Sequence, residues 1–147
     1  MCSYEGDNFV LDKQVVRAAL KSFRALFSSH SPSASALSPS SSYLRLLLEP
    51  SEPPELSESS LQDPMMLILL LEWRAALLVR EHSETAAEPD AGVDQRVSKA
   101  VTEAFIAAQV GKMITSLSLP ASARSAHCIR ALYMLVSLLY LGTSDTA

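Results

Sequence analysis

Apolar residues recur every three or four positions from residue 9 to residue 27, which is the period of one face of an α-helix. The face comprises Val15, Val16, Ala19, Leu20, Phe23, Leu26 and Phe27. Lysines and arginines repeat at the same period on the opposite side, and Asp7 or Asp12 stands near the positive end of the helix dipole. The pattern predicts an amphipathic helix in which Leu20 and Phe23 contribute to the core or to a partner-binding surface.

The segment from residue 64 to about residue 81 is apolar at almost every angle of a helical wheel, a pattern typical of a helix surrounded by protein. Asp63 followed by Pro64 indicates its start, because Asp accepts hydrogen bonds from free N–H groups and Pro suits the first helical position. We expect this helix at the centre of the fold, with Leu69, Trp73 and Leu77 in the core or at a partner interface.

Two more helices are predicted over residues 93–119 and 121–141, separated by Pro120. The first carries a row of small residues that would let a neighbouring helix approach closely. The second is almost entirely apolar and precedes Gly142, a residue suited to a helix C-cap. The candidate core or partner-binding residues here are Phe105, Leu132, Leu135 and Leu139.

Polar loops separate these segments. Residues 28–42 are mostly serine, so they offer too little apolar surface to offset the entropy of ordering, and a disordered loop is predicted. Residues 49–60 form an acidic, proline-rich linker and residues 83–92 a third polar loop, while residues 43–48 suit two turns of helix. We expect five helical segments in a single α-helical domain over residues 1–147.

The sequence has no alternating strand pattern, which favours the all-α class. Residues 12–26, DKQVVRAALKSFRAL, resemble the second helix of a HEAT or armadillo-type repeat, in which an Asp and a Val-Arg pair precede an Ala and Leu stripe. The resemblance implies that Asp12 and Arg17 make polar contacts between stacked repeats. No second copy follows at the repeat period of about 40 to 47 residues. The expected fold is therefore an irregular helical bundle or an α-solenoid fragment with long disordered loops.

Charge and cysteine content narrow the function. The formal net charge is -4, so no overall positive field attracts nucleic acid, and direct nucleic-acid binding is not expected. Cys2 and Cys128 lie at opposite ends of the chain without disulfide or metal-ligand spacing, which favours a reducing compartment, cytoplasmic or nuclear. The acidic N-terminal residues do not resemble a secretion signal.

Catalytic chemistry finds little support in the pattern. The four glycines lack the spacing of a phosphate-binding loop, and His30, His82 and His127 are scattered. His127 and Cys128 would point about 100° apart on a helix. We expect Glu72 to lie on a solvent or interface strip, paired with Arg80 or with another helix, rather than in a catalytic cleft. Arg130 is expected to be ion-paired or to extend toward solvent. We expect no enzyme activity, metal or cofactor.

A last helix that is apolar on all sides must be buried in the chain or covered by a partner. The sequence therefore predicts a non-enzymatic protein–protein interaction or scaffold module, alone or as part of a larger helical-repeat protein. The alternative is a membrane-associated protein using helices 64–81 and 121–141. Charges interrupt both segments and their apolar runs fall short of about 20 residues, so contact with a membrane is the less favoured interpretation. The partner and the oligomeric state are not specified by this pattern.

The serine-rich loop adds one regulatory hypothesis. Ser31 and Ser38 each precede a proline, the minimal site of proline-directed kinases. Phosphate at either serine would add negative charge to a nearly uncharged segment.

Overall fold

The computed structural model describes residues 4–28, 37–48, 53–55, 57, 62–85, 91–116 and 124–142. Its elements in chain order are α1 (Tyr4–Ser28), the 3-10 helix η2 (Pro39–Leu47), α2 (Pro64–Glu84), α3 (Ala91–Ser116) and α4 (Arg124–Gly142). These ranges contain no β-strand, so the predicted all-α class is confirmed.

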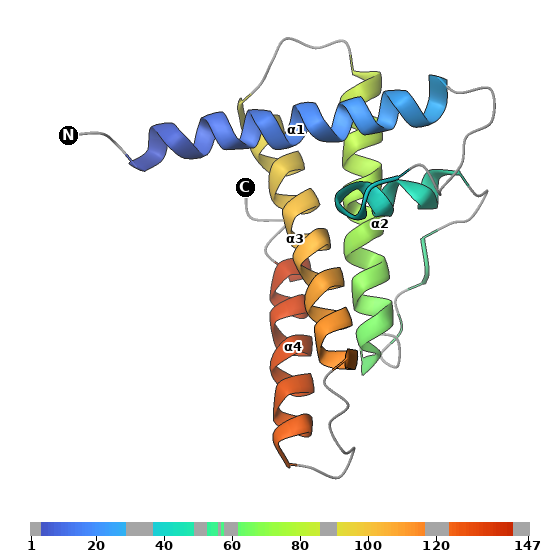
Figure 1. The fold of residues 1–147 in the computed structure, drawn as a ribbon, viewed down its shortest axis with the longest axis vertical. Coiled ribbons are helices and arrows are strands. Elements are labelled where there is room, and N and C mark those ends of the chain that lie inside the picture. Colours follow the sequence, from blue (N-terminus) through green and yellow to red (C-terminus); the bar gives the residue numbers. More distant parts are fainter. Residues whose placement is uncertain are drawn as a thin grey trace.

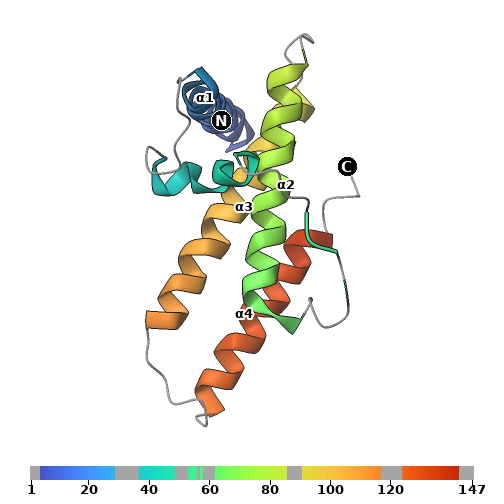
Figure 2. The same cartoon turned by 90° about the vertical axis from the view of Figure 1, so that its right-hand side faces the viewer.

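Three helices pack side by side, and the first helix crosses them. Helices α2, α3 and α4 run up, down and up beside one another, and α1 lies across one end of α2 and α3 (Figure 1). In the perpendicular view, α1 and η2 lie together on one side of α2, whereas the C-terminal end of α4 lies on its other side (Figure 2). Helix α2 therefore occupies the middle of the arrangement.

The amphipathic face predicted for α1 is the face that packs. Val16, Ala19 and Leu26 are buried against α2, α3 and η2, and Leu20 and Phe23 are partly buried beside them. Phe27, expected on the same face, is instead 47% exposed. Its ring lies with its centroid 4.7 Å from that of Phe23, so it covers its neighbour rather than entering the core.

Helix α2 is the core of the molecule, as its pattern predicted. It contacts each of the other four elements. Its fully buried side chains are Leu67, Leu71, Ala75, Ala76 and Val79. The Asp63 side chain accepts a 2.9 Å hydrogen bond from the Met65 N–H, which caps the helix start. Each large apolar side chain buried in this way contributes roughly 1.5 to 3 kcal/mol.

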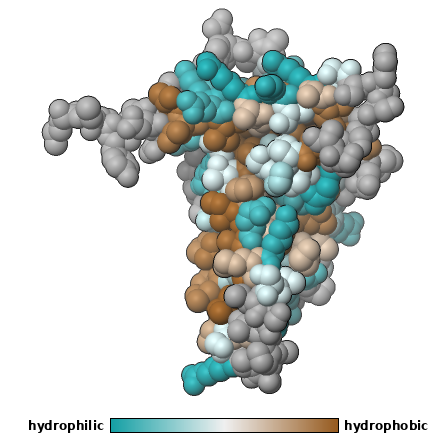
Figure 3. Space-filling view, viewed as in Figure 1, coloured by the Kyte–Doolittle hydropathy of each residue, from teal (hydrophilic) through white to brown (hydrophobic). Residues whose placement is uncertain are grey.

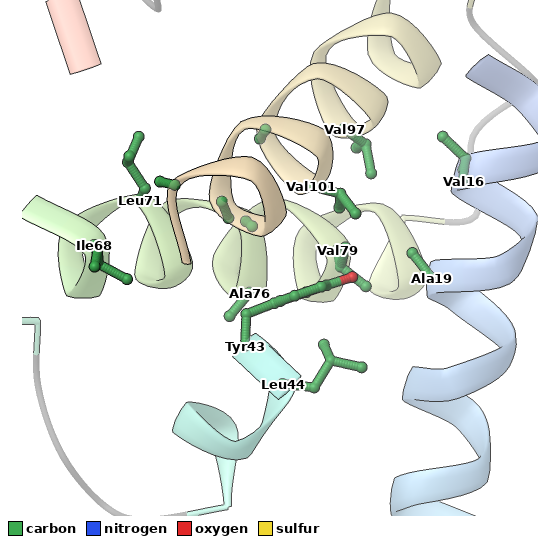
Figure 4. Packing of buried hydrophobic residues seen from close by; sticks show 14 of the residues in the cluster. Val16, Ala19, Tyr43, Leu44, Ile68, Leu71, Ala76, Val79, Val97 and Val101 are labelled. Atoms are coloured by element: carbon green, nitrogen blue, oxygen red, sulfur yellow. The ribbon is translucent and has the colours of Figure 1, made fainter. Parts of the chain in front are cut away.

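Element η2 begins in the serine-rich segment and contributes Tyr43 and Leu44 to the core. The Tyr43 side chain runs from η2 past Ala76 to Val79 of α2, and the Leu44 side chain is directed toward α1 (Figure 4). The element begins at Pro39, earlier than residue 43 where a helix was predicted. The Ser38 Oγ bonds to the hydroxyls of two serines in this first turn, both at 2.9 Å, so the turn satisfies its own polar groups.

The predicted loop boundaries change accordingly. Of the serine-rich loop predicted over residues 28–42, Ser28 ends α1 and residues 39–42 belong to η2. Likewise, the two ends of the loop predicted over 83–92 extend α2 to Glu84 and begin α3 at Ala91. Residues 29–36, which include Ser31, residues 86–90 and most of 49–60 lie outside the described residues.

Candidate protein-binding surface

Helix α4 leaves large apolar side chains in contact with solvent. They are Leu132, 62% exposed, Leu135, 55%, Val136, 43%, and Leu139, 56%. We call these four residues the α4 ridge. Their spacing of three, four and seven residues places them on one face of the helix. A hydrophobic surface covers the flank of the molecule where α4 lies (Figure 3).

The opposite face of α4 is docked by a few specific contacts. Ala126, Tyr133 and Ser137 are buried there. The Tyr133 hydroxyl donates a 2.8 Å hydrogen bond to the Ala107 carbonyl of α3, and burial raises the pKa of Tyr133, an effect partly offset by Ser137. The phenol therefore stays protonated as a donor at neutral pH, and α4 has one defined face against α3.

Gly111 permits this close approach. A Cβ atom at this position would lie 2.8 Å from Ile68 Cδ1 and 3.2 Å from the Tyr133 hydroxyl oxygen. Such distances are shorter than ordinary van der Waals contact, so a side chain at residue 111 would require the Ile68 tip and the Tyr133 phenol to shift. The small-residue row predicted in α3 thus has a packing role at its Gly111 member.

A partly buried cation joins three helices at the C-terminal end of α4. Arg74 of α2 pairs with Glu103 of α3, and its Nη1 donates a 2.7 Å hydrogen bond to the Tyr140 carbonyl of α4. The Arg74 and Glu103 side chains are 18% and 9% exposed. Because the pair is largely shielded from water, it couples the C-terminal end of α4 to the α2–α3 core.

Glu72 is buried, which corrects the prediction that it faces solvent or an interface. Both of its carboxylate oxygens accept hydrogen bonds from Arg45 of η2, at 3.0 and 2.5 Å. The expected partner from another helix is therefore present, and it is not Arg80, which is exposed. This bidentate pair ties η2 to α2 and leaves Glu72 with a structural role.

Two grooves adjoin these contacts. A groove of about 250 Å³ lies between α3 and α4. Its apolar walls include Ile106, Val110, Met113, Ile129, Leu132 and Val136. A second groove of about 870 Å³ lies between η2, α2 and α3, where charged groups such as Lys112 mix with apolar ones such as Met65. The first groove continues the α4 ridge, since Leu132 and Val136 belong to both.

The candidate residues divide into two groups. Trp73 is buried and Leu20, Phe23, Leu69 and Leu77 are half-buried, so these five belong to the core or its edge. Leu132, Leu135 and Leu139 come together on the α4 ridge, and Phe105 is exposed on α3. The apolar pattern alone found all of them, but it carried no signal that separates the two groups.

The polar candidates form no site. Asp12 is half-buried and Arg17 is exposed, and within the described ranges neither takes part in a salt bridge. His127, Cys128 and Arg130 are exposed on α4. Of the residues that the structure describes, no three of His, Cys, Asp or Glu form a group that could hold a metal ion. Ser38 is exposed at the start of η2.

Comparison of the chain with protein-family models, curated proteins and solved structures finds no match. The resemblance of residues 12–26 to a HEAT or armadillo-type helix therefore stays a prediction.

Proposed function

We propose that this chain is a non-enzymatic protein-interaction module and that the α4 ridge, with the α3–α4 groove, receives a helix from another polypeptide. The observation that supports this proposal is the exposure of four large apolar side chains on a helix whose other face is docked by specific hydrogen bonds. Monomeric proteins rarely leave contiguous apolar patches of this kind uncovered, and such patches usually mark interaction sites.

The shape of the surface favours a helical ligand. An amphipathic helix presents side chains at spacings of three and four, which fit between the rows of a ridge and into a groove of matching period. The ridge leucines would be the central anchors, and Ile106 and Met113 would line the far wall of the groove. Each ridge side chain covered in this way gains roughly 1.5 to 3 kcal/mol before the costs of association.

Affinity capture with a matched pair of variants tests the proposal. Leu135→Asp places a charge in the centre of the ridge, whereas Met65→Asp places one at a side chain that is 67% exposed on α2. We expect a polypeptide that binds the wild type and Met65→Asp equally and binds Leu135→Asp at least about tenfold more weakly. Equal capture by all three chains would contradict the proposal.

Association with a membrane is the second candidate, and one observation favours it. In the part of the chain that the structure covers, α4 is long and apolar enough to cross a membrane, as the core helices of soluble proteins also are. The first predicted membrane segment, within α2, is enclosed by the other four elements. Flotation with liposomes separates the candidates: wild-type protein rising with neutral lipid would favour the membrane, and protein staying with the aqueous fraction would favour a polypeptide partner.

A further inference from the structure

Element η2 is attached to the rest of the molecule by few buried side chains. Within η2, the buried residues are Ser41, Tyr43 and Leu44. Most of its contacts are with α2, and its contacts with α1 and α3 are fewer. A 3-10 helix of nine residues is also long for its type, because its hydrogen bonds are less well aligned than those of an α-helix. The position of η2 therefore depends on its fit against α2 more than on its own backbone hydrogen bonds.

One of the buried groups favours the release of η2. The Tyr43 hydroxyl is buried and, among the described residues, has no hydrogen-bond partner. A buried hydroxyl without a partner has lost its hydrogen bonds with water, which raises the free energy of the folded state. The hydroxyl recovers those bonds when η2 moves into solvent. The ring of Tyr43 and the Leu44 side chain oppose the release, because both then become exposed.

The Arg45–Glu72 ion pair also holds η2 on α2, but water reaches one side of it. The Arg45 side chain is 41% exposed, whereas the Glu72 side chain is 6% exposed. Glu72 lines the groove of about 870 Å³ between η2, α2 and α3, and Ser42 and Arg45 form the η2 wall of that groove. Removal of this wall brings water to the Glu72 carboxylate. The departure of η2 therefore does not leave an unpaired charge in a closed core, which is what makes the loss of one partner of a buried pair so destabilising.

We propose that η2 is a detachable segment, which leaves α2 in a local opening while α1, α2, α3 and α4 stay folded. The four α-helices contact one another directly, α1 with α2 and α3, and α4 with α2 and α3, so their packing does not pass through η2. The opening uncovers α2 around Ala76 and Val79, where the Tyr43 side chain lies, and extends the groove along α2 (Figure 4). Access to this face of α2 is thus controlled by the Arg45–Glu72 pair.

This inference goes beyond the proposed function and does not depend on it. The surface that η2 covers lies on one side of α2, and the C-terminal end of α4 lies on the other (Figure 2). The two surfaces can therefore be tested separately.

Labelling of a buried thiol under native conditions tests the proposal. Leu44 of η2 and Leu71 of α2 are both fully buried, so Leu44→Cys and Leu71→Cys form a matched pair. Each is made in the full chain carrying Cys2→Ser and Cys128→Ser, and its reaction with an excess of a disulfide reagent is followed at several urea concentrations below the unfolding transition. We expect the thiol at residue 44 to react at least about tenfold faster than the thiol at residue 71, because a local opening needs less free energy than global unfolding. Its rate should also depend less on urea, since a local opening exposes less surface.

The role of the ion pair is tested in the same assay. Arg45→Met should raise the labelling rate of Leu44→Cys at least about tenfold, because it leaves Glu72 without its cation while η2 is in place. Arg80→Met, at an exposed position of α2, is the control and should leave the rate unchanged. An unchanged rate with Arg45→Met would overturn the control by the ion pair. Equal rates and equal urea dependence at residues 44 and 71 would overturn the whole proposal, since η2 would then leave only when the chain unfolds.

Hydrogen exchange of the unsubstituted chain gives a second measurement, which decides the question if circular dichroism shows that Leu44→Cys fails to fold. Amides of residues 39–47 should exchange at least about tenfold faster than those of residues 67–79, and with a smaller dependence on urea. Equal protection of the two segments would contradict the proposal.

Discussion

Helices α2 and α4 have similar apolar sequences and opposite surroundings. Helix α2 contacts every other element, and five of its side chains are fully buried. Helix α4 contacts α2 and α3 on one face and leaves the α4 ridge in solvent on the other. An all-apolar helix is therefore not a sufficient sign of a core helix, because the number of neighbouring elements decides how much of its circumference is covered.

The largest expected effect on stability comes from comparing one Leu→Asp substitution in α2 with one in α4. Leu71→Asp in α2 should abolish cooperative folding, since an unpaired carboxylate would be buried at a fully enclosed position. Leu135→Asp in α4 should change the free energy of unfolding of the monomer by less than about 0.5 kcal/mol, because the site is exposed. Urea unfolding followed by circular dichroism measures both. Similar stabilities for the two variants would show that α2 and α4 are buried alike.

A smaller loss of stability is expected when the contact that joins α2 to α4 is removed. Arg74→Met should cost about 3 kcal/mol, because Glu103 would be left buried without its cation and the Tyr140 carbonyl without its donor. Hydrogen exchange should show faster exchange in the last turns of α4 than in α2. Arg80→Met, at an exposed position of the same helix, is the control and should leave both the stability and the exchange unchanged.

The smallest effect tests the side of α2 that η2 covers. The Tyr43 hydroxyl is buried and, among the described residues, has no hydrogen-bond partner, so Tyr43→Phe should be neutral or slightly stabilising at pH 7.

The difference in stability between the wild type and Tyr43→Phe should grow at alkaline pH. Burial raises the pKa of Tyr43 above its ordinary value of 10.0. The unfolded chain therefore releases this proton at lower pH than the folded chain does. The wild type should lose stability as the pH rises above about 10, and Tyr43→Phe should lose less. Thermal unfolding at pH 7 and pH 10.5 measures the difference, and identical pH dependence would show that Tyr43 is accessible to water.

Much of the helical layout could be predicted from local signals. The period of α1 and the Asp63 cap of α2 act within a few residues of where they stand. The extent of η2 was missed because its first turn is held by serine hydroxyls, and a serine-rich composition gives no periodic signal. Prediction was therefore best where neighbouring residues alone determine the conformation.

The candidate surface could be predicted only in part. The Arg45–Glu72 and Arg74–Glu103 pairs join residues 27 and 29 positions apart, so no local spacing could reveal them. The exposed face of α4 was not predictable either, because a helix with apolar residues on all sides has no polar face to mark solvent. It required the positions of Tyr133 and Gly111, which turn the opposite face toward α3.

Gly111 also affects how α4 is held against α3. The space above it is filled by the tip of Ile68 and the phenol of Tyr133, which come from the two helices on either side. A bulky side chain there would have to displace both of them, and the Tyr133 hydroxyl would then move away from the Ala107 carbonyl that it bonds. The absence of a side chain at this position therefore lets the Tyr133 hydroxyl reach the α3 backbone and fix the face that α4 turns outward.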